Sequence, residues 1–289
     1  TFQLNNDFQV RHVLEDYLPE DRKSRGNATL LEWTNIYYRR VPHSIVSAPK
    51  RRVRLGLVQW RMRRVSSLEE LLEQVEFFVD AISDYQGDFC VFPEFFNAPL
   101  MSLGNQETSI IAVKSLSTYT SAIYDALSKM AVTYNINIIG GSIPVWEEDA
   151  MFNVGHIFHR DGRVESQQKL HITPQERNSW GIQGGNSLRV FETDAGKVGI
   201  LICYDIEFPE PARIMGERGL EILFVPFWTD TKNGYLRVRR TAQARAIENE
   251  CYVAITGSVG NLPRVDNVDI QYSQSAVFSP SDFAFPHDA

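Results

Sequence analysis

One stretch constrains the fold of this chain more than any other, the segment from Lys197 to Glu210. Its first half, Val198 to Ile202, is apolar, rich in β-branched residues and preceded by a turn dipeptide, which predicts a buried strand. Pro209 then favours a helix start, because proline is tolerated in the first helical turn. Cys203 stands where the strand ends. We expect a thiol at this junction to meet the positive end of a helix dipole, to ionise readily and to act as a nucleophile.

Two other short strands also end on chemically useful groups. Glu94 follows the apolar run Phe89 to Phe92, and Lys169 ends the segment that starts at Arg163. Strand ends in an open α/β sheet converge on one crevice, so a base, a cation and a thiol are expected to meet there. A lone cysteine after an apolar strand is more often a small packed hydrophobe, and the interpretation therefore depends on its two companions.

These residues carry a resemblance to a known family. Phe92-Pro93-Glu94-Phe95, Lys169 to Glu176 and Cys203 to Glu210 resemble, in order and spacing, the three signatures of the nitrilase, or carbon–nitrogen hydrolase, superfamily. Gly140-Gly141-Ser142 and Arg245 to Asn249 add to the match, which runs from about Val53 to the end of the chain. The resemblance implies an α/β fold, the αββα four-layer sandwich of the nitrilase type.

The resemblance also implies roles for the matching residues. Cys203 would attack the substrate carbon and form a thioester, and Glu94 would take the thiol proton, pass it to the leaving amine and then activate water. Lys169 and the backbone N–H of Tyr204 would stabilise the oxyanion. No cofactor and no metal enters this scheme.

Three further residues, Glu176, Trp228 and His171, each have two possible interpretations. Glu176 matches the superfamily's second glutamate and is expected to position Lys169 or the substrate, with a salt bridge in a loop as the alternative. Trp228 is predicted to bind substrate, although core packing is the commoner role of tryptophan. His171 could serve as the base of a Cys–His hydrolase, but Lys169 accounts better for the motif. Glu207 occupies a position where relatives often carry arginine.

The order of elements predicts the rest of the domain. Apolar residues at helical spacing follow a capping-box start at Ser67 and indicate a helix packed on the sheet. Asn97 to Ser117 is predicted to be a loop before a second helix, Thr118 to Tyr134. The alternation of strands and helices favours a parallel central sheet. The segment from Leu170 to Ser187 is polar and is expected to be a loop.

Residues 1–50 fall outside this pattern. We expect a short N-terminal extension or linker with a short helix over Gln9 to Leu18. The stretch resembles the tail of an acetyltransferase-like (GNAT) domain that precedes a nitrilase domain in some proteins. Residues 51–289 form the expected carbon–nitrogen hydrolase domain. Because the chain begins at Thr1 and ends at Ala289 soon after the last predicted strand, we expect it to be a piece of a longer protein with an incomplete C-terminal end.

Composition excludes several classes of protein. The net charge of −7 and the pI near 5.5 argue against nucleic acid as a main partner. No apolar run approaches the roughly 18 residues of a membrane-spanning helix. The three cysteines, Cys90, Cys203 and Cys251, lack the spacing of a disulfide framework or a zinc site, and reduced thiols suit a cytoplasmic protein.

Two functions from different classes remain. The first is hydrolysis of a small non-peptide amide or N-carbamoyl compound, with a nitrile as a less favoured substrate, by a homodimer or higher homo-oligomer. The second is a non-catalytic or regulatory scaffold that partners an acetyltransferase domain. The presence of Glu94, Lys169 and Cys203 together favours the hydrolase, because a scaffold has no need of three chemically competent groups.

Overall fold

The computed structural model describes residues 9–15, 17, 20, 23–25, 27–32, 52–104, 108–262, 265, 268 and 270–281. The chain forms two compact units, Thr1–Arg52 and Val53–Ala289. In the first unit, β1 (Gln9–Leu14) pairs antiparallel with β2 (Ala28–Glu32). The expected helix over Gln9 to Leu18 is therefore wrong. An isolated helix of that length is marginal in water, whereas strand pairing satisfies the backbone groups of both segments.

The second unit contains two sheets, each with six strands among the described residues. The first sheet has the order β3 (Leu55–Leu57), β5 (Phe89–Val91), β6 (Asn137–Glu147), β7 (Ala150–Phe158), β8 (Val164–Gln168), with β9 (Ile182–Gln183) beside β7. The second has the order β10 (Phe191–Thr193), β11 (Gly196–Ile200), β12 (Ile222–Phe227), β13 (Tyr252–Gly260), β14 (Ala276–Phe278), with β4 (Trp60–Met62) beside β13.

Both sheets are mixed, and the expected parallel arrangement holds for their central strands but not for the strands that extend them. Strands β3, β5 and β6 are parallel, as are β11, β12 and β13, but β7 and β8 continue the first sheet antiparallel. Strands β10 and β14 add antiparallel edges to the second sheet. Tight turns at Gly162 and Gly196, both with positive φ, close two of these hairpins.

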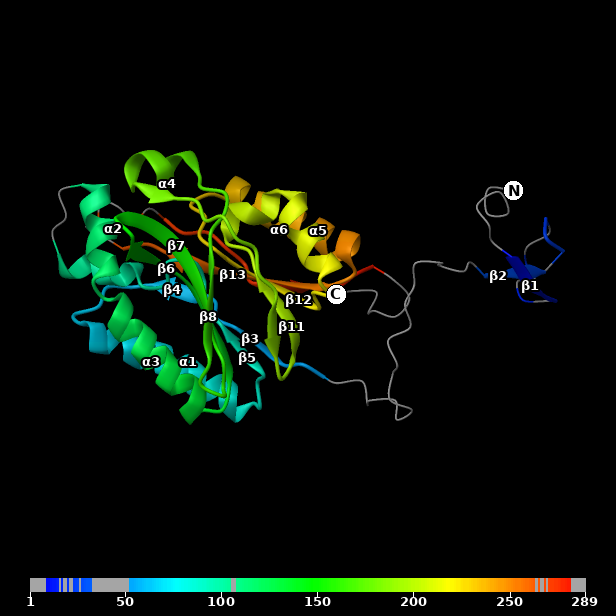
Figure 1. The fold of residues 1–289 in the computed structure, drawn as a ribbon, viewed down its shortest axis with the longest axis horizontal. Coiled ribbons are helices and arrows are strands. Elements are labelled where there is room, and N and C mark those ends of the chain that lie inside the picture. The colour runs from blue at the N-terminus through cyan, green and yellow to red at the C-terminus, as the bar shows by residue number, and fades with distance from the viewer. Residues whose placement is uncertain are drawn as a thin grey trace. The chain divides into compact units, whose positions relative to one another are not determined.

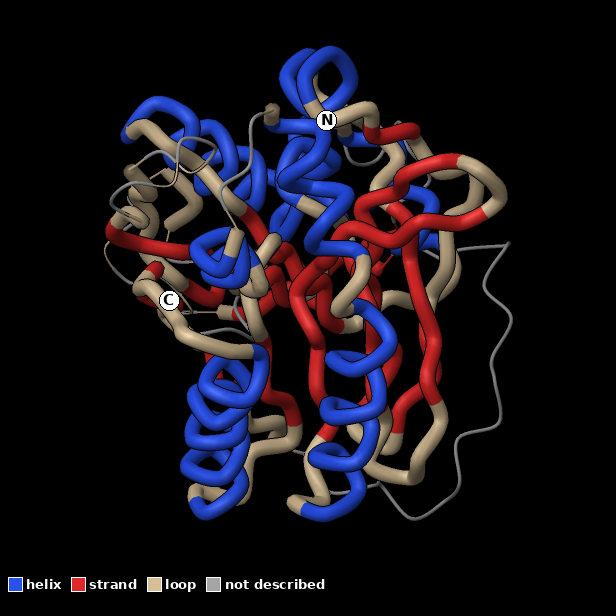
Figure 2. The backbone as a smooth tube through the Cα atoms, turned by 90° about the vertical axis from the view of Figure 1, so that its left-hand side faces the viewer, coloured by secondary structure: helices blue, strands red, loops and turns tan. Residues whose placement is uncertain are grey.

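The sheets lie face to face between two layers of helices. Phe89 and Val91 of β5 point to the core between the sheets, where the rings of Phe89 and Phe224 lie 5.0 Å apart, while Cys90 points to the opposite core. Helices α1 (Leu68–Asp84) and α3 (Thr120–Thr133) cover the outer face of the first sheet, and α5 (Pro209–Glu217) and α6 (Lys232–Asn249) that of the second (Figures 1 and 2). This is the αββα four-layer sandwich that the resemblance implied.

Helix ends follow their capping residues. The Ser67 side chain accepts a hydrogen bond from the Glu70 N–H and starts α1, as predicted. The predicted loop from Asn97 to Ser117 instead contains a 3₁₀ helix, η2 (Ala98–Leu103), and α2 (Ser109–Ser117), because Thr108 caps α2 and its apolar residues pack into the core. The polar segment after Leu170 likewise contains α4 (Pro174–Ser179) and β9.

None of the helices within the described ranges has the length and apolar character needed to cross a membrane.

Candidate active site

The three predicted strand ends meet at one cavity. Glu94 follows β5 and Lys169 follows β8, both in the first sheet, whereas Cys203 follows β11 of the second sheet. All three side chains line a cavity of about 420 Å³. The four-layer packing thus brings together groups that are far apart in the sequence, and the cavity lies where the two sheets end.

Cys203 has a backbone conformation that few non-glycine residues adopt. Its φ is +49°, and it begins the 3₁₀ helix η3 (Cys203–Glu207), which α5 follows. The thiol donates to the carbonyl oxygen of Trp228 over 3.8 Å. A strained residue between a buried strand and a helix resembles the nucleophile turn of the α/β-hydrolase fold, where the turn exposes the reactive atom.

Glu94 is held by the neighbouring strand β6. It forms a bridge with Ser142, and the Phe95 N–H donates to the Ser142 carbonyl over 2.8 Å. Gly141, with φ +54°, allows this close approach, because a Cβ at that position would overlap the carbonyl oxygen of Pro93. The Gly140-Gly141-Ser142 segment of the sequence therefore shapes the strand end that carries Glu94.

Lys169 lies between two carboxylates. Its Nζ is 2.8 Å from Oε1 of Glu94 and 2.8 Å from Oε1 of Glu176, and its side chain is 1% exposed. Glu176 also completes a capping box at the start of α4, where the N–H and hydroxyl of Thr173 both donate to its Oε2. Glu176 thus caps α4 and also pairs directly with Lys169. This contact fits both interpretations of Glu176, the positioning of Lys169 and a salt bridge.

Burial and the neighbouring charges perturb all four groups. Burial raises the pKa of Glu94, although Lys169 opposes this effect. Burial alone would lower the pKa of Lys169, but Glu176 and Glu94 outweigh it, so the pKa lies well above its ordinary value. The pKa of Glu176 is lowered despite burial, mainly because of Lys169. The groups titrate together, so their ionisation is a property of the cluster.

The expectation that Cys203 ionises readily is wrong. Burial, followed by the negative charge of Glu94, raises the pKa of the thiol well above its ordinary value. These effects exceed what Lys169 contributes in the opposite direction. Both effects favour the protonated form of the Cys203 thiol.

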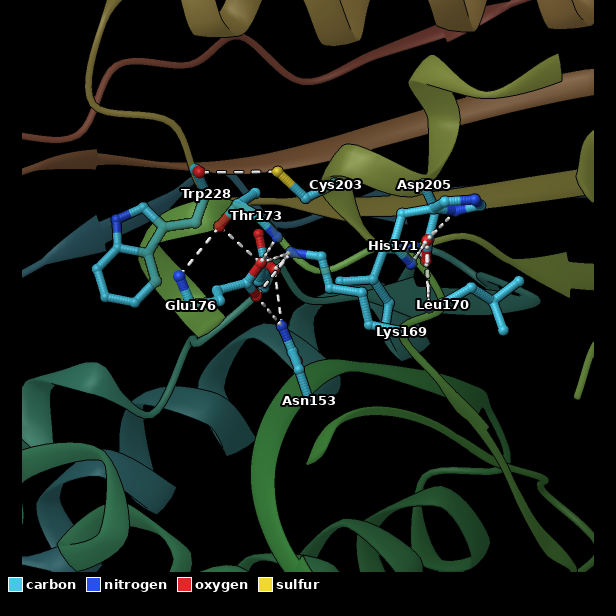
Figure 3. Close-up of polar contacts among 11 residues, drawn as sticks. Asn153, Lys169, Leu170, His171, Thr173, Glu176, Cys203, Asp205 and Trp228 are labelled. Carbon is cyan, nitrogen blue, oxygen red and sulfur yellow. Dashed lines mark hydrogen bonds and ion pairs between the residues drawn. The ribbon is translucent and has the colours of Figure 1, made fainter. Parts of the chain in front are cut away.

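Asp205 ties the loop of Lys169 to the turn of Cys203. Its carboxylate accepts hydrogen bonds from the N–H groups of Leu170 (3.1 Å), His171 (2.7 Å) and Ile202 (3.2 Å) (Figure 3). The His171 ring contacts the same carboxylate over 3.0 Å and stacks on Phe208 at 3.7 Å between centroids. His171 thus faces Asp205, and the reading of this histidine as the base gains no support.

Aromatic and charged side chains both line the cavity. Trp228, Phe95 and Trp180 pack together, with ring centroids 5.1 to 6.0 Å apart. Tyr204 and Glu207 of η3 also line the cavity, and Glu207 pairs with Arg237 Nε over 3.1 Å. Trp228 therefore fits both interpretations, core packing and substrate binding, because its ring packs against other rings and also borders the cavity.

Two polar residues that the sequence did not single out contribute to the site. Asn153 of β7 donates to both Glu94 and Glu176, and Asp205 makes the contacts described above. A polar side chain in the apolar strand Met151 to Phe158 was the available signal for Asn153. Among the described residues, no cluster of three or more His, Cys, Asp or Glu side chains is arranged to hold a metal ion.

Comparison with known proteins yields consistent matches. A sequence model of the family described as carbon-nitrogen hydrolase matches residues 54–281. The probable hydrolase YhcX of Bacillus subtilis is 48% identical over 290 residues, which cover 100% of this chain and 56% of that protein. The omega-amidase NIT2 of Xenopus tropicalis is 30% identical over 209 residues, which cover 70% of this chain and 72% of that protein.

Solved structures share the fold at low sequence identity. The amidase from Nesterenkonia sp. AN1, in a variant that shows the result of Michael addition of acrylamide at its active site cysteine, superposes with a TM-score of 0.67 at 21% identity. The match covers 80% of this chain and 86% of that one. Nit3 of Saccharomyces cerevisiae, a member of branch 10 of the nitrilase superfamily, superposes with a TM-score of 0.62 at 22% identity, over 79% of this chain and 90% of that one.

Proposed function

The chain belongs to the carbon–nitrogen hydrolase family, and on that premise we propose that it hydrolyses a small non-peptide amide or N-carbamoyl compound through a thioester on Cys203. One observation carries the proposal. A thiol, a carboxylate and an ammonium from three strand ends border the same cavity, and that cavity is large enough for a small molecule.

In the first half of the reaction, the Cys203 sulfur attacks the amide carbon while Glu94 takes the thiol proton. The negative charge that develops on the substrate oxygen is stabilised by Lys169 and by the backbone N–H of Tyr204. When the carbon–nitrogen bond breaks, protonated Glu94 returns the proton to the leaving nitrogen. Ammonia or an amine departs and the acyl group remains on sulfur. The raised pKa of Glu94 suits a group that has to accept a proton and give it back.

In the second half, Glu94 takes a proton from a water molecule as that water attacks the thioester carbon. The carbon–sulfur bond breaks, the thiol regains its proton, and the product leaves as a carboxylic or carbamic acid. The same oxyanion contacts serve both halves, because each passes through a tetrahedral intermediate.

The substrate class rests on the cavity and on the relatives. A cavity of about 420 Å³ lined by aromatic and charged side chains admits a compact molecule and not a folded polypeptide. Relatives include proteins named omega-amidases, which supports an amide over a nitrile. Because the chain spans 56% of the length of YhcX, any activity that depends on a further domain stays outside this proposal.

Intact-protein mass spectrometry tests the proposal. The protein is exposed briefly to short amides, monoamides of dicarboxylic acids and N-carbamoyl amines, and released ammonia is measured in parallel. Wild type is expected to show a transient acyl adduct on Cys203, whereas Glu94→Gln should slow both adduct formation and ammonia release, because it lacks the base that takes the thiol proton and later activates water. Cys203→Ala should give neither adduct nor ammonia, while Cys251→Ala, a buried thiol outside the cavity, should behave as wild type. Product formation by Cys203→Ala would contradict the mechanism.

The scaffold alternative is not favoured, since the three reactive groups share one cavity rather than serving separate structural roles.

We also propose a homodimer that forms through α5 and α6. Ile214 of α5 is 40% exposed and Ile247 of α6 is 54% exposed, an apolar character that suits an interface. Light scattering that gives the mass of a single chain would contradict this.

A further inference from the structure

Asn153 occupies an unusual position next to the reactive cluster. It lies on β7, is 0% exposed, and donates from Nδ2 to Oε1 of Glu94 (2.8 Å) and to Oε1 of Glu176 (3.1 Å). Its Oδ1 is buried and has no hydrogen-bond partner among the described residues. A buried amide oxygen without a hydrogen-bond partner destabilises the folded protein. The hydrogen bonds made by the NH₂ end of the same amide must therefore offset that cost.

The orientation of this amide follows from chemistry. Two ionised carboxylates can only accept hydrogen bonds, and therefore the NH₂ end has to face them. Asn153 is also fixed from its backbone, where its carbonyl accepts from the Lys169 N–H over 2.8 Å. The same residue thus places the lysine through its main chain and the two carboxylates through its side chain.

The two carboxylate oxygens of Glu94 differ in the hydrogen bonds that they accept. Lys169 Nζ and Asn153 Nδ2 both donate to Oε1, at 2.8 Å each, whereas neither of them contacts Oε2. An oxygen that already accepts two hydrogen bonds is a poor site for a further proton. This pattern leaves Oε2 as the oxygen better suited to accept a proton, and the hydrogen bond from the amide opposes rotation of the carboxylate.

We propose that Asn153 is a positioning residue that fixes Glu94 with Oε2 free to receive the Cys203 proton, and that it keeps Glu94 ionised beside Glu176. The inference rests on the proposed function of the same site. Removing the amide takes away a hydrogen bond to the charged form of Glu94, so the carboxylate would ionise only at higher pH.

The test follows alkylation of Cys203 by iodoacetamide against pH, with modification located by mass spectrometry. Asn153→Leu removes both donors and keeps a similar shape. The pH at which alkylation accelerates is expected to rise by about one unit or more, which is an approximately tenfold loss of rate below it. Asn137→Leu is the matched control, because Asn137 is a 1% exposed amide of the same sheet that contacts Asp88 and Asp194 instead.

A second comparison separates positioning from general damage. In a Glu94→Gln background, Asn153→Leu is expected to cause no further loss of alkylation, because it acts through the carboxylate. An equal loss in both backgrounds, or a pH profile of Asn153→Leu that coincides with wild type, would overturn the proposal. If Asn153→Leu does not fold, Asn153→Ser is used and should shift the profile in the same direction. The assay needs no substrate, so a wild type that alkylates but hydrolyses no amide would count against the proposed function alone.

Discussion

Replacing Lys169 by methionine should destabilise the protein by an amount that grows with pH. The substitution keeps the length of the side chain but leaves Glu94 and Glu176 buried together without the cation that lies 2.8 Å from each. Removing one partner of a buried ion pair typically costs about 3–5 kcal/mol. We expect a penalty of that size near neutral pH, measured by urea denaturation followed by tryptophan fluorescence.

The pH dependence follows from Glu176. In the wild type its pKa is lowered, so it is ionised in both the folded and unfolded states above about pH 4.5, and stability does not change there on its account. In Lys169→Met its folded pKa should rise above the unfolded value. The folded protein then keeps a proton that the unfolded chain releases. The penalty should therefore increase with pH, by up to about 1.4 kcal/mol per unit, until the folded pKa is passed.

Two controls make the result interpretable. Lys169→Met/Glu176→Gln removes the unpaired charge as well and should recover part of the loss. Lys197→Met removes an exposed pair with Glu192, where the side chains are 42% and 75% exposed, and should cost less than about 1 kcal/mol at every pH. A penalty for Lys169→Met that is equally small, or that does not vary between about pH 5 and about pH 8, would refute the reasoning.

Three further outcomes are expected. Gly141→Ala should lower both the melting temperature and the alkylation rate of Cys203, because its Cβ would push against the carbonyl of Pro93 beside Glu94; thermal melts and mass spectrometry measure both. Asp205→Ala leaves three backbone N–H groups without an acceptor and should cost about 1–3 kcal/mol in urea denaturation, with a lower kcat. Trp228→Leu should raise KM more than it lowers kcat in steady-state kinetics, since the ring borders the cavity and contacts no reacting group.

The sequence predicted the parts of the fold that depend on local patterns. Ser67 and the apolar spacing after it identified α1. The alternation of strands and helices predicted the parallel strands β3, β5 and β6. It did not show that antiparallel strands extend each sheet, because a short apolar strand has the same pattern in a parallel and in a mixed sheet. The four-layer arrangement came from the family resemblance and not from the pattern of residues.

The candidate site was predictable only in part for a related reason. Glu94, Lys169 and Cys203 stand at strand ends within recognisable motifs. Asn153 lies 59 residues from Glu94, and Asp205 lies 35 residues from Leu170, so their contacts arise only when the sheets pack. A single buried asparagine or a carboxylate after a cysteine has many ordinary explanations in a sequence, and distance along the chain hides the partner that decides between them.

The raised pKa of the Cys203 thiol bears on how the buried cluster of charged groups works. A helix start favours a thiolate, but burial and the charge of Glu94 favour the thiol more strongly. At rest, the charge of Lys169 is shared between two carboxylates. In the proposed mechanism, Glu94 becomes neutral when it takes the thiol proton, and Lys169 is left with one charged partner and the new charge on the substrate oxygen. Proton transfer therefore moves a negative charge from the base to the substrate without changing the total charge of the buried site. The lysine is thus present before the reaction in the place where it is needed, and little rearrangement accompanies the attack.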